Sequence, residues 1–176
     1  MKKSVATVLL AVLALALTSC GGNNDDTQAA QSISDSIMKQ QKSAGTASQF
    51  FTMKRKDADC IGKGFVDKIG ADQLRKDGVL TKDNKVKDSV TNVKMSSSEA
   101  KSATDVLFSC TNVENMMQTA MSKSGNVPAS MKDCVDKVLT EANLRPMFEK
   151  VFQGQQDEAQ KALIGPMMKC ATGNQG

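Results

Sequence analysis

Histidine, tryptophan and tyrosine are all absent from this chain of 176 residues, which has only three prolines and six phenylalanines. Without histidine there is no imidazole to act as the base of a catalytic triad, or to hold a metal ion. Without tyrosine and tryptophan, two of the side chains that stack on nucleic-acid bases are missing. We therefore expect no enzymatic activity, no metal or other cofactor, and no nucleic-acid partner.

The chain has a single long apolar run, from Val5 to Leu17, which follows Lys2 and Lys3. A helix that crosses a bilayer needs about 20 apolar residues, so this run is too short to span one. It has the length of the apolar region of a secretory signal peptide. The run ends in Leu17-Thr18-Ser19-Cys20, where small residues precede a cysteine.

This ending resembles the lipobox of bacterial lipoprotein precursors, and the resemblance covers residues 1–22. It implies that residues 1–19 are removed as a signal peptide and that Cys20 is lipidated. Two or three acyl chains would then hold the mature protein at the cell membrane, on its extracytoplasmic face. An ordinary signal peptide with a chance cysteine is the alternative. Because residues 21–28 include no apolar side chain, we expect residues 20–30 to be a flexible tether before a folded domain, 31–176.

Removal of the signal peptide also changes the charge and cysteine counts. The mature chain keeps 21 basic and 19 acidic residues, and they are interspersed, without a basic cluster suited to a phosphate backbone. If Cys20 is lipidated, four of the five cysteines remain: Cys60, Cys110, Cys134 and Cys170. Outside the cytosol four cysteines favour two disulfides, and the lack of a Cys-x-x-Cys pair argues against a metal site.

An internal repeat divides the domain into two units, at about 50–125 and 126–172. Asp59-Cys60-Ile61 and Asp133-Cys134-Val135 are each followed by lysine, a large apolar residue and an acid at the same spacings. Ser97-Ser98-Glu99-Ala100 leads into a helix that ends at Cys110, and Gln156-Asp157-Glu158-Ala159 into one that ends at Cys170. Chance similarity between amphipathic helices is the alternative.

Disulfide pairing can be inferred from this repeat only in part. Antiparallel packing of the early and late helices of each unit would favour the pairs Cys60–Cys110 and Cys134–Cys170. The alternative, Cys60–Cys170 with Cys110–Cys134, would join the two units, and four cysteines permit either arrangement.

The mature part also resembles uncharacterised secreted and lipid-anchored proteins of actinobacteria with duplicated units. The residues concerned are the lipobox, Ala58-Asp59-Cys60, Phe65-Val66-Asp67, and Ser98-Glu99-Ala100 leading to Cys110. The resemblance covers most of residues 30–172, although the second unit lacks the Gly-x-Gly and the serine run. It implies no known activity.

Helical spacing predicts an all-α fold, a small disulfide-stapled helical bundle built from two similar helical units. Ile61, Phe65 and Ile69 lie four residues apart, as core-facing residues of a helix do. Ser96 and Glu99 have the spacing of a capping box, and Gly70, Gly78, Gly125 and Gly154 are expected to end helices. The first unit has 14 more residues between its cysteines, which we place near 79–95, either as a surface loop or as a partner-binding arm.

Methionine is concentrated in the second half of the chain. Most methionines there are expected to fill the core, but thioethers also suit adaptable binding surfaces. The candidate apolar groove comprises Met116, Met117, Met121, Phe148, Phe152, Met167 and Met168. The leading functional hypothesis is a non-enzymatic interaction or structural module at the cell envelope, with an unknown envelope protein as partner. The alternative is a carrier of an apolar ligand or lipid in that groove.

Overall fold

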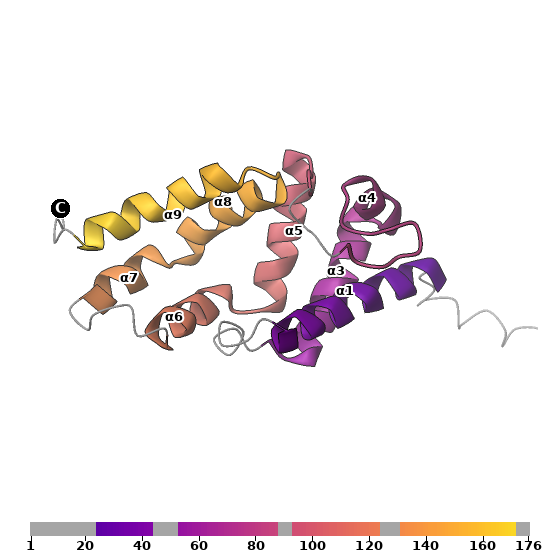
Figure 1. Ribbon diagram of the computed structural model, residues 1–176, viewed down its shortest axis with the longest axis horizontal. Helices are drawn as coiled ribbons and strands as arrows, with labels where there is room; N and C mark the ends of the chain where they lie inside the picture. The colour runs from indigo at the N-terminus through magenta and orange to yellow at the C-terminus, as the bar shows by residue number, and fades with distance from the viewer. Residues whose placement is uncertain (1–23, 44–52, 88–92, 124–130, 172–176) are drawn as a thin grey trace, which may run out of the picture.

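The computed structural model describes residues 24–43, 53–87, 93–123 and 131–171. Its named elements are all α-helices, which confirms the all-α class (Figure 1). In chain order they are α1 (Asn24–Ser43), α3 (Arg55–Ile69), α4 (Ala71–Lys76), α5 (Ser97–Cys110), α6 (Val113–Lys123), α7 (Lys132–Val138), α8 (Glu141–Phe152) and α9 (Gln156–Ala171).

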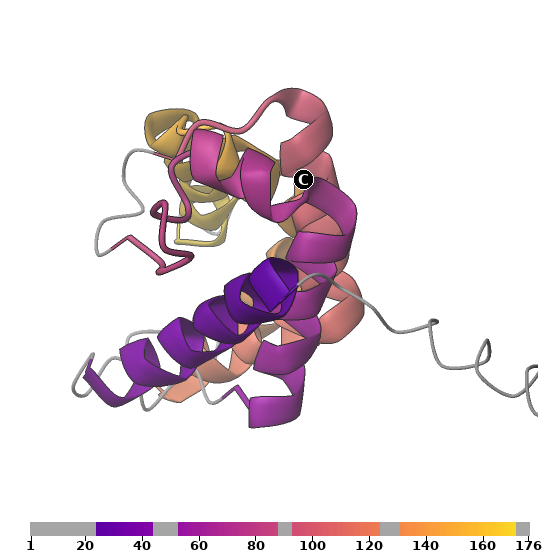
Figure 2. The ribbon, with the colours of Figure 1, turned by 90° about the vertical axis from the view of Figure 1, so that its right-hand side faces the viewer.

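Helix α5 stands between two groups of helices (Figure 1). On one side α1 lies along α3, with α4 beyond them, as both ribbon views show (Figures 1 and 2). On the other side α8 and α9 run beside each other, and α6 and α7 lie below them in Figure 1. In the part of the chain that the structure describes, no helix combines the length and the apolar character needed to cross a membrane.

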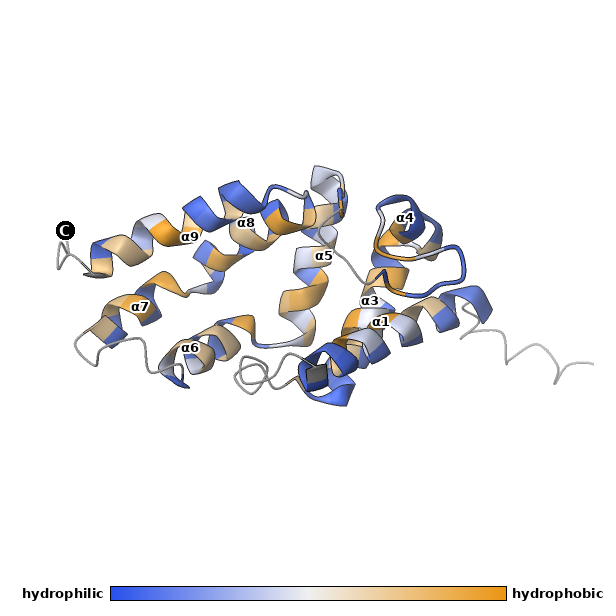
Figure 3. Cartoon of the chain, in the orientation of Figure 1, coloured by the Kyte–Doolittle hydropathy of each residue, from blue (hydrophilic) through white to orange (hydrophobic). Residues whose placement is uncertain are grey.

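Local sequence signals account for the helices and their ends. Bands of hydrophobic and hydrophilic residues follow one another along the helices (Figure 3). This is the pattern of amphipathic helices, in which apolar residues recur every three or four positions. The expected capping box begins α5: the Ser96 hydroxyl accepts from the Glu99 amide, and the Glu99 carboxylate accepts from the Ser96 amide at 2.7 Å. Gly70, Gly78 and Gly154 follow α3, α4 and α8 with positive φ angles, as predicted for helix ends. Gly125 lies outside the described residues.

Each disulfide lies within one of the two units expected from the sequence. Cys60, early in α3, is bonded to Cys110, the last residue of α5, and their Cα atoms are 5.6 Å apart. Cys134 in α7 is bonded to Cys170 near the end of α9, also with 5.6 Å between Cα atoms. The pairing that would have joined the two units is therefore not the one in the structure.

The described residues form two hydrophobic cores. The first core lies among α1, α3, α4, α5 and the segment 79–95, and it buries fourteen hydrophobic residues. The second lies among α6, α7, α8 and α9, and it buries four, namely Val113, Val135, Leu139 and Leu144. Partly buried methionines and phenylalanines surround the second core. Leu107 contacts both cores, so α5 is shared between them.

Two glycines allow α3 to pack closely against its neighbours. A Cβ atom on Gly62 would collide with the backbone carbonyl of Ala30 in α1. A Cβ atom on Gly64 would collide with the side chain of Val106 in α5. Close helix packing therefore accounts for the Gly-x-Gly sequence that distinguishes the first unit from the second.

The expectation of a flexible tether over residues 20–30 is wrong from Asn24 onward, where α1 begins. Asp25 and Asp26 stabilise the positive end of the helix dipole, and Ala29 is fully buried. The Asp25 carboxylate also accepts from Asn84 Nδ2 at 2.6 Å and pairs with Arg75 at 3.0 Å. These two hydrogen bonds, that from Asn84 above all, lower the pKa of Asp25.

The described parts of the segment expected to be a loop or a binding arm, residues 79–87 and 93–95, contribute to the first core. Val79, Leu80, Val93 and Met95 are buried in the first core. Residues 79–87 turn back on themselves through an isolated antiparallel bridge between Leu80 and Val86. At the turn Asn84, only 2% exposed, bonds to α1 and α4 and so holds residues 79–87 against these helices.

Candidate functional site

An apolar pocket of about 340 Å³ opens into the first core. Helix α1 forms one wall, and Val79, Val86, Val93 and Met95 form another. Met53 and residues of α3, α5, α8 and the start of α9 complete the lining. Twelve of its fifteen lining residues are apolar: Ile33, Ile37, Met53, Ile61, Phe65, Val79, Val86, Val93, Met95, Leu107, Val151 and Phe152. Such a pocket suits an apolar molecule because its walls lose little hydration when a ligand enters.

The pocket lies where the first unit meets the end of α8. The rings of Phe65 in α3 and Phe152 in α8 pack edge to face, with centroids 6.0 Å apart. The Met95 amide donates to the Phe152 carbonyl at 3.0 Å. At Gly154 a Cβ atom would lie 2.7 Å from the Val93 carbonyl oxygen, so this turn needs glycine to approach the pocket wall.

Three uncharged polar residues, Ser36, Gln40 and Gln156, complete the lining. Ser36 and Gln40 are four residues apart on α1, and Gln40 Nε2 donates a hydrogen bond to Ser36 Oγ at 3.4 Å. Gln156 is the first residue of α9 and is exposed. None of the fifteen lining residues is charged, so the site offers hydrogen bonds without a counter-charge.

The residues of the expected Met/Phe groove divide between the two cores and the surface. Met117, Met121, Phe148 and Met167 pack against the second core. Met116 accepts a hydrogen bond from Thr111, and Met168 is 61% exposed. Only Phe152 lines the apolar pocket. We therefore correct the position of the expected groove from the second half of the chain to the first core.

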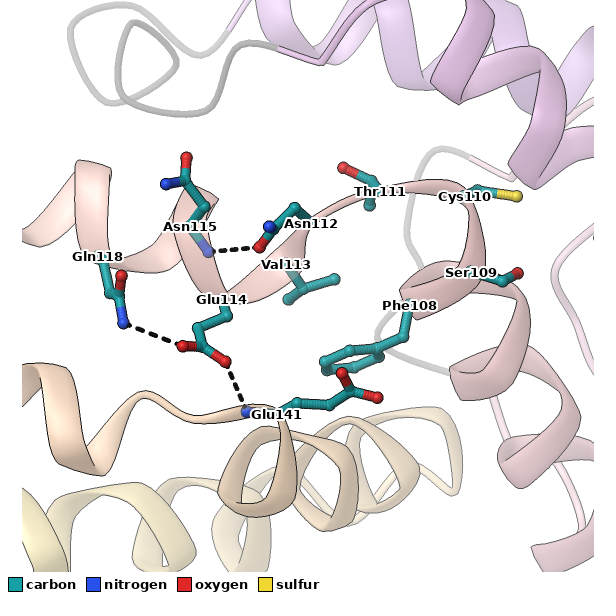
Figure 4. A pocket seen from close by; sticks show the side chains of 10 residues that line it. All are labelled: Phe108, Ser109, Cys110, Thr111, Asn112, Val113, Glu114, Asn115, Gln118 and Glu141. Carbon is teal, nitrogen blue, oxygen red and sulfur yellow. Dashed lines mark hydrogen bonds between the residues drawn. The ribbon is translucent and has the colours of Figure 1, made fainter.

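A second pocket, of about 500 Å³, lies where α5 turns into α6, opposite the start of α8 (Figure 4). Glu114 lies at its centre and accepts from Gln118 Nε2 at 3.3 Å and from the Glu141 amide at 3.1 Å. Asn112 Oδ1 accepts from the Asn115 amide at 2.8 Å. These polar groups bind one another: Glu114 caps α8 and Asn112 caps α6, which is a structural role.

Next to this polar pocket, Arg145 joins α8 to α5. Its guanidinium donates to Glu141 and to Asp105, both at 2.6 Å, and lies 4.7 Å from the centre of the Phe108 ring. The hydrogen bond to Glu141 is the main cause that raises the pKa of Arg145. The pKa of Asp105 is lowered, first by Lys101 and also by Arg145. This cluster joins α5 to α8, which is a structural role.

One serine has the carboxylate partner that an activated nucleophile would need. Ser34, buried in α1, donates to Asp59 in α3, and Arg55 donates to the same carboxylate oxygen at 2.9 Å. The bond from Ser34, followed by the charge of Arg55, lowers the pKa of Asp59. The Asp59 carboxylate thus joins Ser34 of α1 to Arg55 of α3, which is a structural role.

Over the described ranges, His, Cys, Asp and Glu side chains nowhere gather in threes at metal-binding distance. Cys20 lies outside the described residues. No protein-family model, curated protein or solved structure matches this chain.

Proposed function

We propose that this protein is a lipid-anchored, extracytoplasmic binding protein that holds a small apolar molecule in the first-core pocket without chemically changing it. The observation that carries the proposal is the pocket itself, whose lining is apolar at twelve of fifteen positions. Its volume of about 340 Å³ falls within the range of about 300–1,000 Å³ common for small-molecule sites.

The position of the domain relative to Cys20 also supports the proposal. Helix α1 begins at Asn24, four residues after the cysteine that the lipobox assigns to the lipid. Four residues span at most about 14 Å when fully extended. A lipidated Cys20 would therefore keep the pocket-bearing domain close to the membrane surface, where apolar molecules concentrate.

The hypothesis of an interaction module requires an exposed apolar surface. The large hydrophobic residues with high exposure among those described are Val151, Ile164 and Met168. Val151 belongs to the pocket lining, which leaves Ile164 and Met168 on α9 as a small patch. Patches of this size are normal on soluble domains, so the binding hypothesis has the stronger support.

Fluorescence titration tests the binding proposal. The mature chain with Cys20→Ser avoids competing lipid and detergent, and N-phenylnaphthylamine serves as the apolar probe. We expect saturable binding with a rise in probe emission. Ile37→Trp should fill the pocket and weaken probe binding at least about tenfold, which is a loss of about 1.4 kcal/mol of binding free energy.

Ile164→Trp, on the exposed face of α9, is the matched control and should leave probe affinity unchanged. Far-ultraviolet circular dichroism of both variants, recorded during thermal unfolding, reports whether the helical domain remains folded. Equal probe affinity in the two folded variants would argue against the pocket as the binding site.

The anchor has a separate test. Mass spectrometry of the N-terminal peptide from the membrane fraction should find Cys20 as the first residue, carrying acyl chains. Cys20→Ser should release the protein from the membrane fraction. An unmodified Cys20 in a membrane-free protein would contradict the localisation and leave the binding proposal to be judged by the titration.

A further inference from the structure

Helix α9 has an apolar outward face where a surface helix normally has polar side chains. None of the seven residues 162–168 has a polar side chain, and each of them is exposed or partly exposed. Ile164 and Met168 are the most exposed large hydrophobic residues among those described, at 51% and 61%. They are four residues apart and therefore lie on one face of the helix. Single exposed hydrophobic residues are common on soluble domains, but a run of this kind points to a contact.

The charged residues of α9 are separated along its length. Both of its acidic residues lie in the first turn. From residue 159 to the end of the helix the only charged residues are Lys161 and Lys169. Lys161 is three residues before Ile164, and Lys169 follows Met168 directly, so the two lysines flank the apolar pair. This part of α9 therefore combines exposed apolar side chains with positive charge.

The neighbouring helices do not offset this positive charge. Helices α7 and α8 pack against α9, and each of them has two basic and two acidic residues. Anionic lipid head groups attract lysines near a membrane surface, and apolar side chains beside those lysines can enter the region beneath the head groups. The charge and the apolar character of this face fit an anionic lipid surface.

The size of the face favours a lipid surface over a protein partner. A stable protein interface buries about 800 Å² on each partner, far more than two exposed side chains provide. A lipid surface requires no matching shape. A weak contact with it also gains from a tether that already holds the protein at the membrane, because the second contact is then intramolecular.

The position of this face complements that of the proposed anchor. The N-terminal end of α1 and the C-terminal end of α9 lie at opposite ends of the longest axis of the molecule (Figure 1). A tether at Cys20 alone would leave the far end of the domain free to swing away from the membrane. Contact through α9 would hold the second end there as well.

We propose that the face of α9 formed by Lys161, Ile164, Met168 and Lys169 binds the surface of an anionic lipid bilayer. The two apolar side chains enter the head-group region, and the two lysines lie among the lipid phosphates. The domain then lies along the membrane, held at one end by its anchor and at the other by α9. This inference rests on the proposed membrane location, and it does not depend on what the apolar pocket binds.

Fluorescence of a tethered chain tests this orientation. In the mature chain Ile164→Trp introduces the only tryptophan, and Cys20 is the only free thiol because the other four cysteines form disulfides. Cys20 is coupled to a maleimide lipid in phosphatidylglycerol vesicles, which supplies the tether whatever modification the cell adds. Lipids brominated along their acyl chains should lower the tryptophan emission at least about twofold, because this side chain would then lie at the membrane interface.

The two lysines should be needed for this quenching. Lys161→Gln with Lys169→Gln, added to the tryptophan variant, should remove at least about half of the quenching, because both attractions to the anionic surface are lost. Lys54→Gln with Lys56→Gln removes the same charge at exposed positions at the start of α3 and should leave the quenching unchanged.

Three results would overturn the inference. Emission that brominated lipid leaves unchanged would show that α9 does not reach the bilayer. Equal quenching in phosphatidylglycerol and phosphatidylcholine vesicles would contradict the role of the lysines. If the Ile164→Trp chain sediments as a dimer without vesicles, and Met168→Gln restores the monomer, the face binds a second copy of the chain. The titration of N-phenylnaphthylamine contains no membrane, so its outcome separates a failure of the proposed function from a failure of this inference.

Discussion

The two disulfide-linked halves of this protein share a sequence pattern but differ in how they are held together. The first core, around α3 and α5, contains fourteen buried hydrophobic residues, and the second core, among α6, α7, α8 and α9, contains four. Both have a disulfide between an early and a late helix, with sequence separations of 50 and 36. The covalent frame is therefore repeated, and the packing inside it is not.

The difference comes from two additions to the first half. Helix α1 contributes Ala29 and Ile33 to the first core, and the segment 79–95 contributes Val79, Leu80, Val93 and Met95. The same two additions form walls of the apolar pocket. The disulfide-bonded helices serve as a frame, and helix α1 with Val79, Leu80, Val93 and Met95 enlarges the first core.

Removing each disulfide separately should give the largest contrast between the halves. The chain-entropy model assigns about 4 kcal/mol to closing either loop, so the outcome depends on the packing that remains. Cys134→Ala with Cys170→Ala should unfold α7 and α9, and hydrogen exchange should show their amides losing protection while α3 and α5 keep theirs. Cys60→Ala with Cys110→Ala should lower the melting temperature and leave both halves folded. A global loss of protection in both double variants would show that the cores are equally dependent on their disulfides.

Glycine-to-alanine substitutions in the two halves should have different effects. Gly62→Ala places a Cβ atom against the Ala30 carbonyl, which must move α1 away from α3 and cost about 2–3 kcal/mol. Gly165→Ala in α9 meets no atom within 4 Å. Its gain in helix propensity is offset by the crowding that Pro166 imposes on the preceding residue, so a change within about 0.5 kcal/mol is expected.

Chemical denaturation measures both effects, and the probe titration adds a second readout. Because α1 lines the pocket, Gly62→Ala should also weaken N-phenylnaphthylamine binding, whereas Gly165→Ala should not. A destabilised Gly62→Ala variant that binds the probe normally would mean that the position of α1 does not shape the pocket.

The first half also contains a buried aspartate, Asp77, whose charge should lower the free energy of unfolding. Asp77 is 8% exposed at the end of α4, where its Oδ1 accepts from Gln73 and its Oδ2 is buried without a partner. Burial is the main cause that raises the pKa of Asp77 above 3.8. The folded state therefore binds the proton more tightly, and the charged form costs stability at every pH above the folded-state pKa.

Asp77→Asn should raise the free energy of unfolding by about 1 kcal/mol at neutral pH, because the uncompensated charge is removed. This gain should shrink as the pH falls through the folded-state pKa, since the natural protein then loses its own penalty. Urea denaturation over a pH series measures it, with Asp83→Asn, at an exposed position on the neighbouring turn, as control. A gain that does not change with pH would assign the effect to something other than the charge.

Helices were predictable from the sequence wherever a short-range pattern specified them. Ile61 and Phe65 are buried on one face of α3, and Ser96 and Glu99 form the expected capping box. Residues 24–28 have no apolar side chain and were expected to be a tether. They are helical because Asp25 is bound by Arg75 and Asn84, which lie 50 and 59 residues further along the chain. No local pattern carries that information.

The candidate site was predicted in kind but not in place. A lining of methionine and phenylalanine was expected from the abundance of methionine after residue 115, yet most of those methionines pack against the small second core. The available signal was the apolar residues Val79, Val86, Val93 and Met95 within a polar segment, which a solvent-exposed loop does not need. Phe152 alone belongs to both the expected and the observed site.

Helical character follows from the order of residues, because it depends on side chains a few positions apart. The place of the pocket does not follow from it. The pocket requires Val79, Val86, Val93 and Met95 to line one space with residues of α1 and the end of α8, and the Met95 amide is bonded to the Phe152 carbonyl. Such a contact forms only when helices distant in the chain pack together, so folding, and no motif, places the apolar site in the first half.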